Sequence, residues 1–204
     1  MLNKIKLLLV LIPLLVISDQ VNAKQVKLLI LGDSLSAAYG MKQEQGWVNL
    51  LQNKWQDKSI TLINAAISGE TSQGGLARLP RLLNQHNPSH LLIELGGNDG
   101  LRGYPVNKLK HNLGAMIELA RQQNVKVLLQ EIQIPTNFGR RYTDMFTNSF
   151  SEVAENYDMP LIPFFLQDIA TDDSLMQNDR IHPNERAQPK ISDFMAQQLS
   201  PYLF

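Results

Sequence analysis

The sequence predicts an α/β fold in which helices cover both faces of a parallel, five-stranded sheet. Apolar segments alternate five times with segments of helical periodicity, the pattern of repeated βαβ units. Several of the apolar segments are nearly continuous, as in strands that are buried on both faces. Because crossovers between parallel strands are right-handed, we expect a doubly wound strand order such as 2-1-3-4-5.

Five apolar runs are predicted to form the strands. They cover residues 26–32, 60–66, 90–97, 125–134 and 160–165. Helices are predicted at 46–55, 111–124, 143–157 and 186–199. The positions that these helices are expected to bury are Trp47, Leu50, Leu51 and Trp55, then Leu113, Met116, Ile117 and Ala120, then Met145, Phe146, Phe150, Val153 and Tyr157, and finally Ile191, Phe194, Met195 and Leu199.

The composition is that of one globular domain. The chain has 204 residues, 44% of them hydrophobic and 19% charged, which is enough for one sizeable core. It contains no internal repeat, no low-complexity stretch and no linker rich in Pro, Gly or Ser. The formal net charge of zero argues against a nucleic-acid partner. With no cysteine, the chain lacks disulfides, thiol nucleophiles and thiolate zinc ligands.

The N-terminus has the features of a secretory signal peptide. Two lysines precede an apolar run at 7–17, and a small-residue cleavage pattern ends at Ala23. The apolar run is too short for a helix that spans a membrane. We therefore expect 1–23 to be removed, leaving a single domain at 24–204 that is periplasmic or secreted and has no membrane span. An uncleaved membrane anchor is the alternative, and Pro13 weakens it.

Polar and glycine-rich residues follow the predicted strands at the edge of the sheet where ligands bind in such folds. Taken singly, each segment is typical of a turn or a helix cap, but their convergence on one edge predicts a functional site. The residues are Gly32, Asp33 and Ser34 after the first strand, Ser68 and Gly69 after the second, Gly97, Asn98 and Asp99 after the third, 134–142 after the fourth and 178–184 after the fifth.

Of the four histidines, His182 has the surroundings of a catalytic base. Asp179 precedes it by three residues, so a turn can bring the carboxylate to the imidazole. Pro183 follows and restricts the backbone of His182. A serine hydroxyl is a poor nucleophile until a base takes its proton, so we expect His182 to activate Ser34 and Asp179 to orient the ring. The alternative is a solvated histidine in a surface turn.

Attack of a serine on a carbonyl also requires hydrogen-bond donors for the oxyanion. The candidates are the backbone N–H groups of Ser34 and Gly69 and the side-chain amide of Asn98. A glycine at position 69 lets the backbone approach the substrate without an intervening Cβ. We expect Ser34 to lie on a loop that opens a helix, whose first N–H groups would also favour the oxyanion.

Four ordered blocks carry a resemblance to a known family. The blocks are GDSLS (32–36), SGET (68–71), GGND (96–99) and DRIHP (179–183), and they extend over almost all of the predicted domain. With these blocks the chain resembles the GDSL, or SGNH, hydrolases. It is especially similar to the multifunctional periplasmic thioesterase, lysophospholipase and arylesterase subgroup.

The resemblance implies a flavodoxin-like, three-layer α/β/α sandwich with Ser34, Asp179 and His182 as the triad. It also implies that Gly69 and Asn98 join Ser34 in the oxyanion hole, and that the substrates are acyl esters, thioesters or lysophospholipids. By this resemblance 74–80 is a mobile loop that closes on acyl chains. We expect a monomer that needs no cofactor and no metal. The expected substrate-binding residues are Leu76, Leu79, Pro80, Ile134, Pro135 and Phe138.

The chain departs from the family pattern at Arg180, because a glycine usually follows the triad aspartate. A cation there could narrow the site, favour anionic substrates or point to solvent. Two rival functions are a cell-envelope carbohydrate O-deacetylase of the same family and a non-catalytic periplasmic binding module. A third is a metal-dependent hydrolase, whose ligands would be Asp33, Asp99, Asp179 and His182, although no zinc-binding helix spacing is present.

Overall fold

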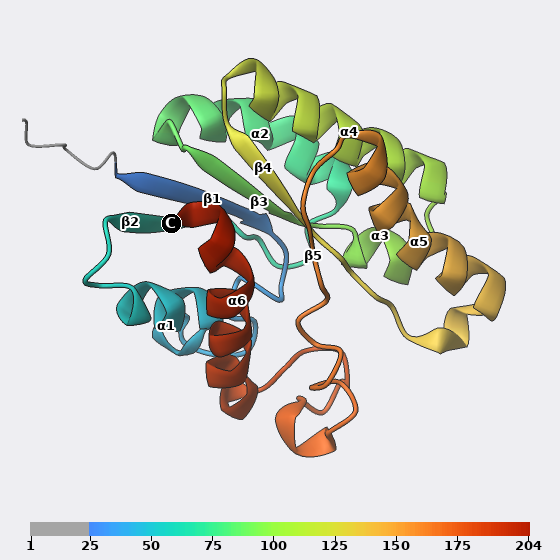
Figure 1. The fold of residues 1–204 in the computed structure, drawn as a ribbon. Helices are drawn as coiled ribbons and strands as arrows, with labels where there is room; N and C mark the ends of the chain where they lie inside the picture. The colour runs from blue at the N-terminus through green and yellow to red at the C-terminus, as the bar shows by residue number, and fades with distance from the viewer. Residues whose placement is uncertain (1–24) are drawn as a thin grey trace, which may run out of the picture.

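The computed structural model describes residues 25–204, and in it five parallel strands form one sheet in the order β2-β1-β3-β4-β5. Figure 1 shows this sheet between two layers of helices, so the predicted fold class and strand order are confirmed. The signal-peptide prediction for 1–23 lies outside the described residues. The strands are β1 (Val26–Gly32), β2 (Ile60–Asn64), β3 (His90–Glu94), β4 (Lys126–Gln130) and β5 (Leu161–Ile162).

Two helices pack together on one face of the sheet and three cover the other (Figure 1). The first face carries α1 (Trp47–Lys54) and α6 (Gln188–Leu203). The second carries α2 (Ser72–His86), α4 (Val106–Gln122) and α5 (Arg140–Asn156), and the short α3 (Gly97–Leu101) follows β3. None of the helices within 25–204 is long and apolar enough to cross a membrane.

The central strand β3 and its neighbour β1 form the middle of the core. Residues 28–31 and 91–93 are fully buried, and the strands pair in register from Leu28 opposite His90 to Gly32 opposite Glu94. Burial on both faces explains why these strands are continuous apolar runs rather than alternating ones. The strands are shorter than predicted at their carboxyl ends, because 95–97 and 131–134 leave the sheet to form the edge that carries the site.

The helical faces are largely as predicted, although Leu50, Tyr157 and Phe194 are only half-buried, and two larger differences occur. The expected positions on α4 are fully buried, as are Phe146 and Phe150 on α5. Met145, however, is 49% exposed, because it lies over the surface between α4 and α5 and not beneath it. The other difference is α2, a helix where the sequence predicted a loop, whose Leu79 and Leu83 are fully buried in the core.

Candidate active site

Ser34 lies directly after β1, in a turn at the carboxyl edge of the sheet. The turn is tied by Asp33, whose Oδ1 accepts a hydrogen bond from the Leu35 N–H at 3.0 Å and whose carbonyl accepts from Ala37 N–H at 3.0 Å. Residues 34–40 form turns and no α-helix begins here, so the expected helix N-terminus at Ser34 is wrong. The nucleophile candidate is therefore held by a local Asp33 turn, without a helix dipole behind it.

His182 and Asp179 meet Ser34 at this edge. His182 Nε2 lies 2.9 Å from Ser34 Oγ, and His182 Nδ1 lies 2.6 Å from Asp179 Oδ2. The Tyr39 ring packs against the imidazole, with centroids 4.2 Å apart. The structure thus brings together the hydroxyl, the imidazole and the carboxylate that the sequence singled out, in the order that general-base activation of a hydroxyl requires.

The loop that carries Asp179 fixes the position of the imidazole. Asp179 Oδ1 accepts hydrogen bonds from the N–H groups of Ile181 at 2.9 Å and His182 at 3.0 Å. Partial burial raises the pKa of Asp179, but these bonds and the imidazole outweigh it, so the pKa lies below its usual value. An ionised carboxylate accepts a hydrogen bond from Nδ1–H, which leaves Nε2 free to accept the Ser34 proton.

The three expected oxyanion donors lie in the loops that follow β1, β2 and β3, and Ser34 and Asn98 line the same cavity. Gly69 follows β2 with φ of +79°, a conformation that favours glycine, and nothing within 4 Å would meet a Cβ there. Within the described residues, the N–H groups of Ser34 and Gly69 make no hydrogen bond. Asn98 Nδ2 donates to Asp33 Oδ2 at 3.1 Å and to the Glu70 carbonyl at 2.9 Å, so both amide hydrogens are engaged. To donate to an oxyanion as well, the Asn98 amide would have to share one of these two hydrogens with it.

A buried polar network, which the sequence reasoning missed, places Asn98 beside the Gly69 loop. Asp99 Oδ2 accepts from Ser72 N–H at 2.8 Å and Asp99 Oδ1 from Ser72 Oγ–H at 2.6 Å. Asn112 Nδ2 in turn donates to Ser72 Oγ at 2.9 Å. The network joins the start of α2 to α3 and α4, and it gives Asp99 a structural role. The signal in the sequence was a polar Asn112 on the apolar face of a predicted helix.

Two buried acids lie beneath the site. Glu94 is fully buried, and its Oε2 accepts from Ser36 Oγ–H at 2.7 Å and Asp33 N–H at 3.2 Å. Burial, and after it the nearby charge of Asp33, raises the pKa of Glu94 well above its usual value. Burial also raises the pKa of Asp33 from 3.8 to about 6, against the lowering effects of its hydrogen bonds and of His182. Burial and the nearby carboxylate of Asp33 therefore favour the neutral form of Glu94.

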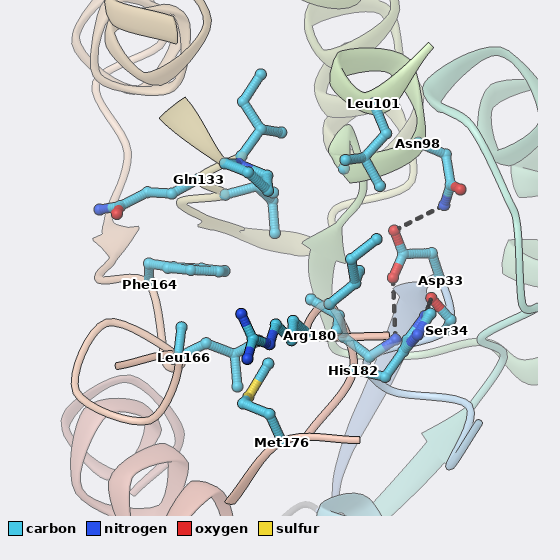
Figure 2. Close-up of a pocket in the computed structure, with 17 residues that line it drawn as sticks. Asp33, Ser34, Asn98, Leu101, Gln133, Phe164, Leu166, Met176, Arg180 and His182 are labelled. Carbon is cyan, nitrogen blue, oxygen red and sulfur yellow. Dashed lines mark hydrogen bonds between the residues drawn. The ribbon is translucent and has the colours of Figure 1, made fainter. Parts of the chain in front are cut away.

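A cavity of about 340 Å³ opens beside Ser34 and His182 (Figure 2). Figure 2 shows Ser34, Asp33 and His182 at one side of the cavity and Phe164 and Leu166 at the other. Most of its walls are apolar. They include Leu101 from α3, Ile132, Ile134 and Pro135 after β4, and Phe164, Leu166, Ala170, Met176 and Ile181 from the segment after β5.

Two of the six expected substrate-binding residues, Ile134 and Pro135, line this cavity, and four do not. Leu76, Leu79 and Pro80 belong to α2, and Leu79 is fully buried in the core, so the expected loop at 74–80 is wrong. Phe138 is 37% exposed in a single helical turn outside the cavity.

Sequence reasoning also missed the cavity wall that follows β5. Phe164, Leu166 and Met176 had the composition of core residues and no motif marked them. Of the alternative metal ligands, Asp99 is bound to Ser72, and within 25–204 no group of acids and histidines is arranged to hold a metal ion.

The chain is similar to known proteins in both sequence and structure. Residues 30–188 match the model of the GDSL-like Lipase/Acylhydrolase family. The chain is 49% identical to "Thioesterase 1/protease 1/lysophospholipase L1" of Escherichia coli K12 over 174 residues, covering 85% of this chain and 83% of that protein. It is 46% identical to an arylesterase of Vibrio mimicus, covering 87% and 90%. The crystal structure of the psychrotrophic esterase EstA from Pseudoalteromonas sp., inhibited by monoethylphosphonate, superposes with a TM-score of 0.85 at 52% identity, covering 87% and 98%.

Proposed function

Because the chain belongs to the GDSL-like lipase/acylhydrolase family, we propose that it hydrolyses esters and thioesters of acyl chains with Ser34 as the nucleophile. The observation that carries the proposal is the Ser34–His182–Asp179 chain of hydrogen bonds at one end of an apolar cavity. The names of the relatives, a thioesterase and lysophospholipase and an arylesterase, support the same substrate classes. Aryl esters, acyl thioesters and lysophospholipids all present an acyl chain beside a carbonyl.

In the first step, His182 Nε2 takes the proton of Ser34 Oγ as the oxygen attacks the carbonyl carbon. The carbonyl π electrons move to the oxygen, which becomes an oxyanion. The N–H groups of Ser34 and Gly69 have no other partner within the described residues, so they are ready to donate to it. The third donor, the Asn98 amide, shares its hydrogen with Asp33 Oδ2 as the oxyanion forms.

When the tetrahedral intermediate collapses, the protonated His182 gives its proton to the departing alcohol or thiol. The acyl group then remains on Ser34 Oγ as an ester. In the second half, His182 takes a proton from water, the hydroxide attacks the acyl carbon, and the proton returns to Ser34 Oγ as the acid leaves. Asp179 stays ionised throughout and stabilises the imidazolium, which its lowered pKa permits.

The cavity favours acyl chains over a carbohydrate acetyl group. An O-deacetylase needs room for a polar sugar, whereas the cavity walls beside Ser34 are mostly apolar side chains such as Ile134, Pro135 and Leu166. We further propose that 24–204 is the mature domain, that it acts as a monomer, and that it works in the periplasm or outside the cell. The signal-peptide features of the first residues support this location.

The test is hydrolysis of a series of p-nitrophenyl esters from acetate to palmitate by the wild type and by Ser34→Ala. We expect turnover by the wild type, with a preference for a chain that fills the cavity, and loss of turnover in the variant. Ser59→Ala, at an exposed position outside the cavity lining, is the matched control and should behave as the wild type. Retained activity in Ser34→Ala would exclude Ser34 as the nucleophile.

A further inference from the structure

Arg180 is held in an unusual backbone conformation beside the site. Its φ is +57°, in the left-handed region that costs free energy for every residue except glycine. The conformation is imposed by its neighbours, since Asp179 Oδ1 accepts the N–H groups of Ile181 and His182, and the Gln177 carbonyl accepts the Arg180 N–H at 3.0 Å. The turn that positions His182 therefore determines where the Arg180 side chain emerges.

That side chain emerges into the substrate cavity. Arg180 is one of the lining residues, and Figure 2 shows its guanidinium extending away from His182 toward Leu166. It is 78% exposed, and its ionic partner is Asp173, 3.7 Å away and 81% exposed. Exposed pairs of this length contribute little stability, and water competes for the same donors. The guanidinium is thus held at the cavity with most of its donors available.

Two other arginines, Arg78 and Arg102, are used differently. Arg78 Nε donates to Glu70 at 2.6 Å, and Arg78 Nη2 donates to the Ala65 carbonyl at 2.6 Å. The guanidinium of Arg78 is therefore bound within the protein. Arg102 Nη2 donates to the Gly69 carbonyl at 3.1 Å. Within the described residues, the Arg180 guanidinium makes no hydrogen bond. Its five N–H donors therefore remain for a ligand.

The charges that line the cavity leave Arg180 without an internal counter-charge. Asp33 is the one acid among the described lining residues, and its carboxylate is buried and bonded to Leu35 and Asn98. The remaining walls are mostly apolar. A cation at the end of an apolar surface matches a molecule with an acyl chain and a negative group, because the guanidinium fork binds carboxylate or phosphate through two parallel hydrogen bonds.

We propose that Arg180 is a specificity-determining residue that binds an anionic oxygen group of the substrate while the acyl chain lies on the apolar wall. The inference rests on the proposed hydrolase function, because it concerns the substrate of that same site. Two sources carry this chemistry: a carboxylate at the far end of a short acyl chain, and a phosphate in the departing alcohol. The Arg180 guanidinium makes no hydrogen bond to Ser34 or His182, so we expect its contribution to appear in KM.

The experiment compares kcat/KM for two matched pairs of esters, each with one anionic and one neutral member. The carboxylate pair is mono-p-nitrophenyl glutarate and p-nitrophenyl pentanoate, and the phosphate pair is lauroyl lysophosphatidic acid and monolauroylglycerol. Arg180→Gln removes the charge, Arg180→Gly also removes the backbone strain, and Arg180→Lys keeps the charge without the fork. Arg140→Gln, which removes an exposed arginine that does not line the cavity, is the matched control.

We expect the anionic-to-neutral ratio to fall about five- to tenfold in Arg180→Gln and Arg180→Gly for one of the pairs, through KM. The fall should be smaller in Arg180→Lys and absent in Arg140→Gln. The pair that responds identifies the source of the anionic group. In the wild type, the ratio should also decrease as salt screens the interaction.

Unchanged ratios for both pairs, with the neutral esters still hydrolysed, would overturn the inference and leave the hydrolase function intact. An equal fall in Arg140→Gln would also overturn it, since the effect would then reflect the overall charge of the surface. A wild-type protein that hydrolyses none of the four esters would instead refute the proposed function, and the inference would fall with it.

Discussion

Replacement of Asp33 by Asn tests the electrostatics beneath Ser34, the proposed nucleophile. Asp33 is 2% exposed, and burial raises its pKa from 3.8 to about 6. Between these two pH values the folded protein binds more protons than the unfolded chain, so the free energy of unfolding falls as the pH rises. At about 1.4 kcal/mol per pH unit, the ionised Asp33 costs the folded state about 3 kcal/mol above pH ~6.

The Asp33→Asn variant cannot ionise and does not carry this cost. We therefore expect its free energy of unfolding, relative to the wild type, to rise by about 2.5 kcal/mol between pH ~4 and pH ~8, whatever the offset at low pH. Urea unfolding followed by the fluorescence of Trp47 and Trp55, repeated across this range, measures the difference. Asp57→Asn, at an exposed position in a turn, is the control whose difference should stay constant.

A difference that is independent of pH would refute the reasoning, because it would mean that burial does not raise the pKa of Asp33. Activity provides a second readout. The amide introduced by Asp33→Asn would turn either its oxygen or its nitrogen toward Asn98, and it cannot serve both Leu35 N–H and Asn98 Nδ2 as the carboxylate does. We expect kcat to fall even where the variant is more stable, which would show that Asp33 contributes to the site and not to the stability of the fold.

Three further predictions concern residues in and beside the site. Asn98→Ala should lower kcat by about 10²–10³ with little change in KM, and an unchanged kcat would remove Asn98 from the oxyanion hole. Tyr39→Leu should lower kcat about threefold to tenfold, because the ring that packs on His182 at 4.2 Å is lost; an unaltered kcat would show that Asp179 alone orients the imidazole. Gly100→Ala would place a Cβ 2.7 Å from Ile134 Cγ2, so we expect a cost of about 1–3 kcal/mol in urea unfolding and a shift to shorter esters; a variant with wild-type stability and preference would contradict this.

The sheet and the meeting of the polar loops could be predicted from the sequence because their signals are local. Continuous apolar runs mark strands buried on both faces, and parallel strands bring their following loops to one edge. Ser34 directly follows such a run, and the spacing of Asp179 and His182 fits a turn that joins carboxylate to imidazole. Each of these features is determined by residues that are close together in the chain, so it can be predicted from the sequence.

The features that were predicted wrongly from the sequence depend on packing between segments that are far apart in the chain. The stretch that forms α2 contains Gly75 and Pro80, which are loop signals, yet a Cβ at Gly75 would lie 2.2 Å from Leu95. The glycine is needed for the close approach of the helix to the sheet, and only the folded structure reveals this. The family resemblance placed Leu79 in a substrate loop, but Leu79 belongs to the core.

The cavity wall after β5 could not be predicted either. Phe164, Leu166 and Met176 have the apolar character of core residues, and no periodicity distinguishes a side chain that packs inside from one that lines a cavity. Glu94 was part of an apolar strand in the sequence, and its link to Ser36 and Asp33 became visible only when the strands were paired.

Reaction with a fluorophosphonate, followed by mass mapping of the adduct, would show most directly whether His182 activates Ser34. We expect one covalent adduct on Ser34, no adduct in Ser34→Ala, and much slower labelling in His182→Ala, because Ser34 Oγ then lacks the base that lies 2.9 Å away. An adduct on another residue, or labelling of His182→Ala at the wild-type rate, would contradict this role of His182.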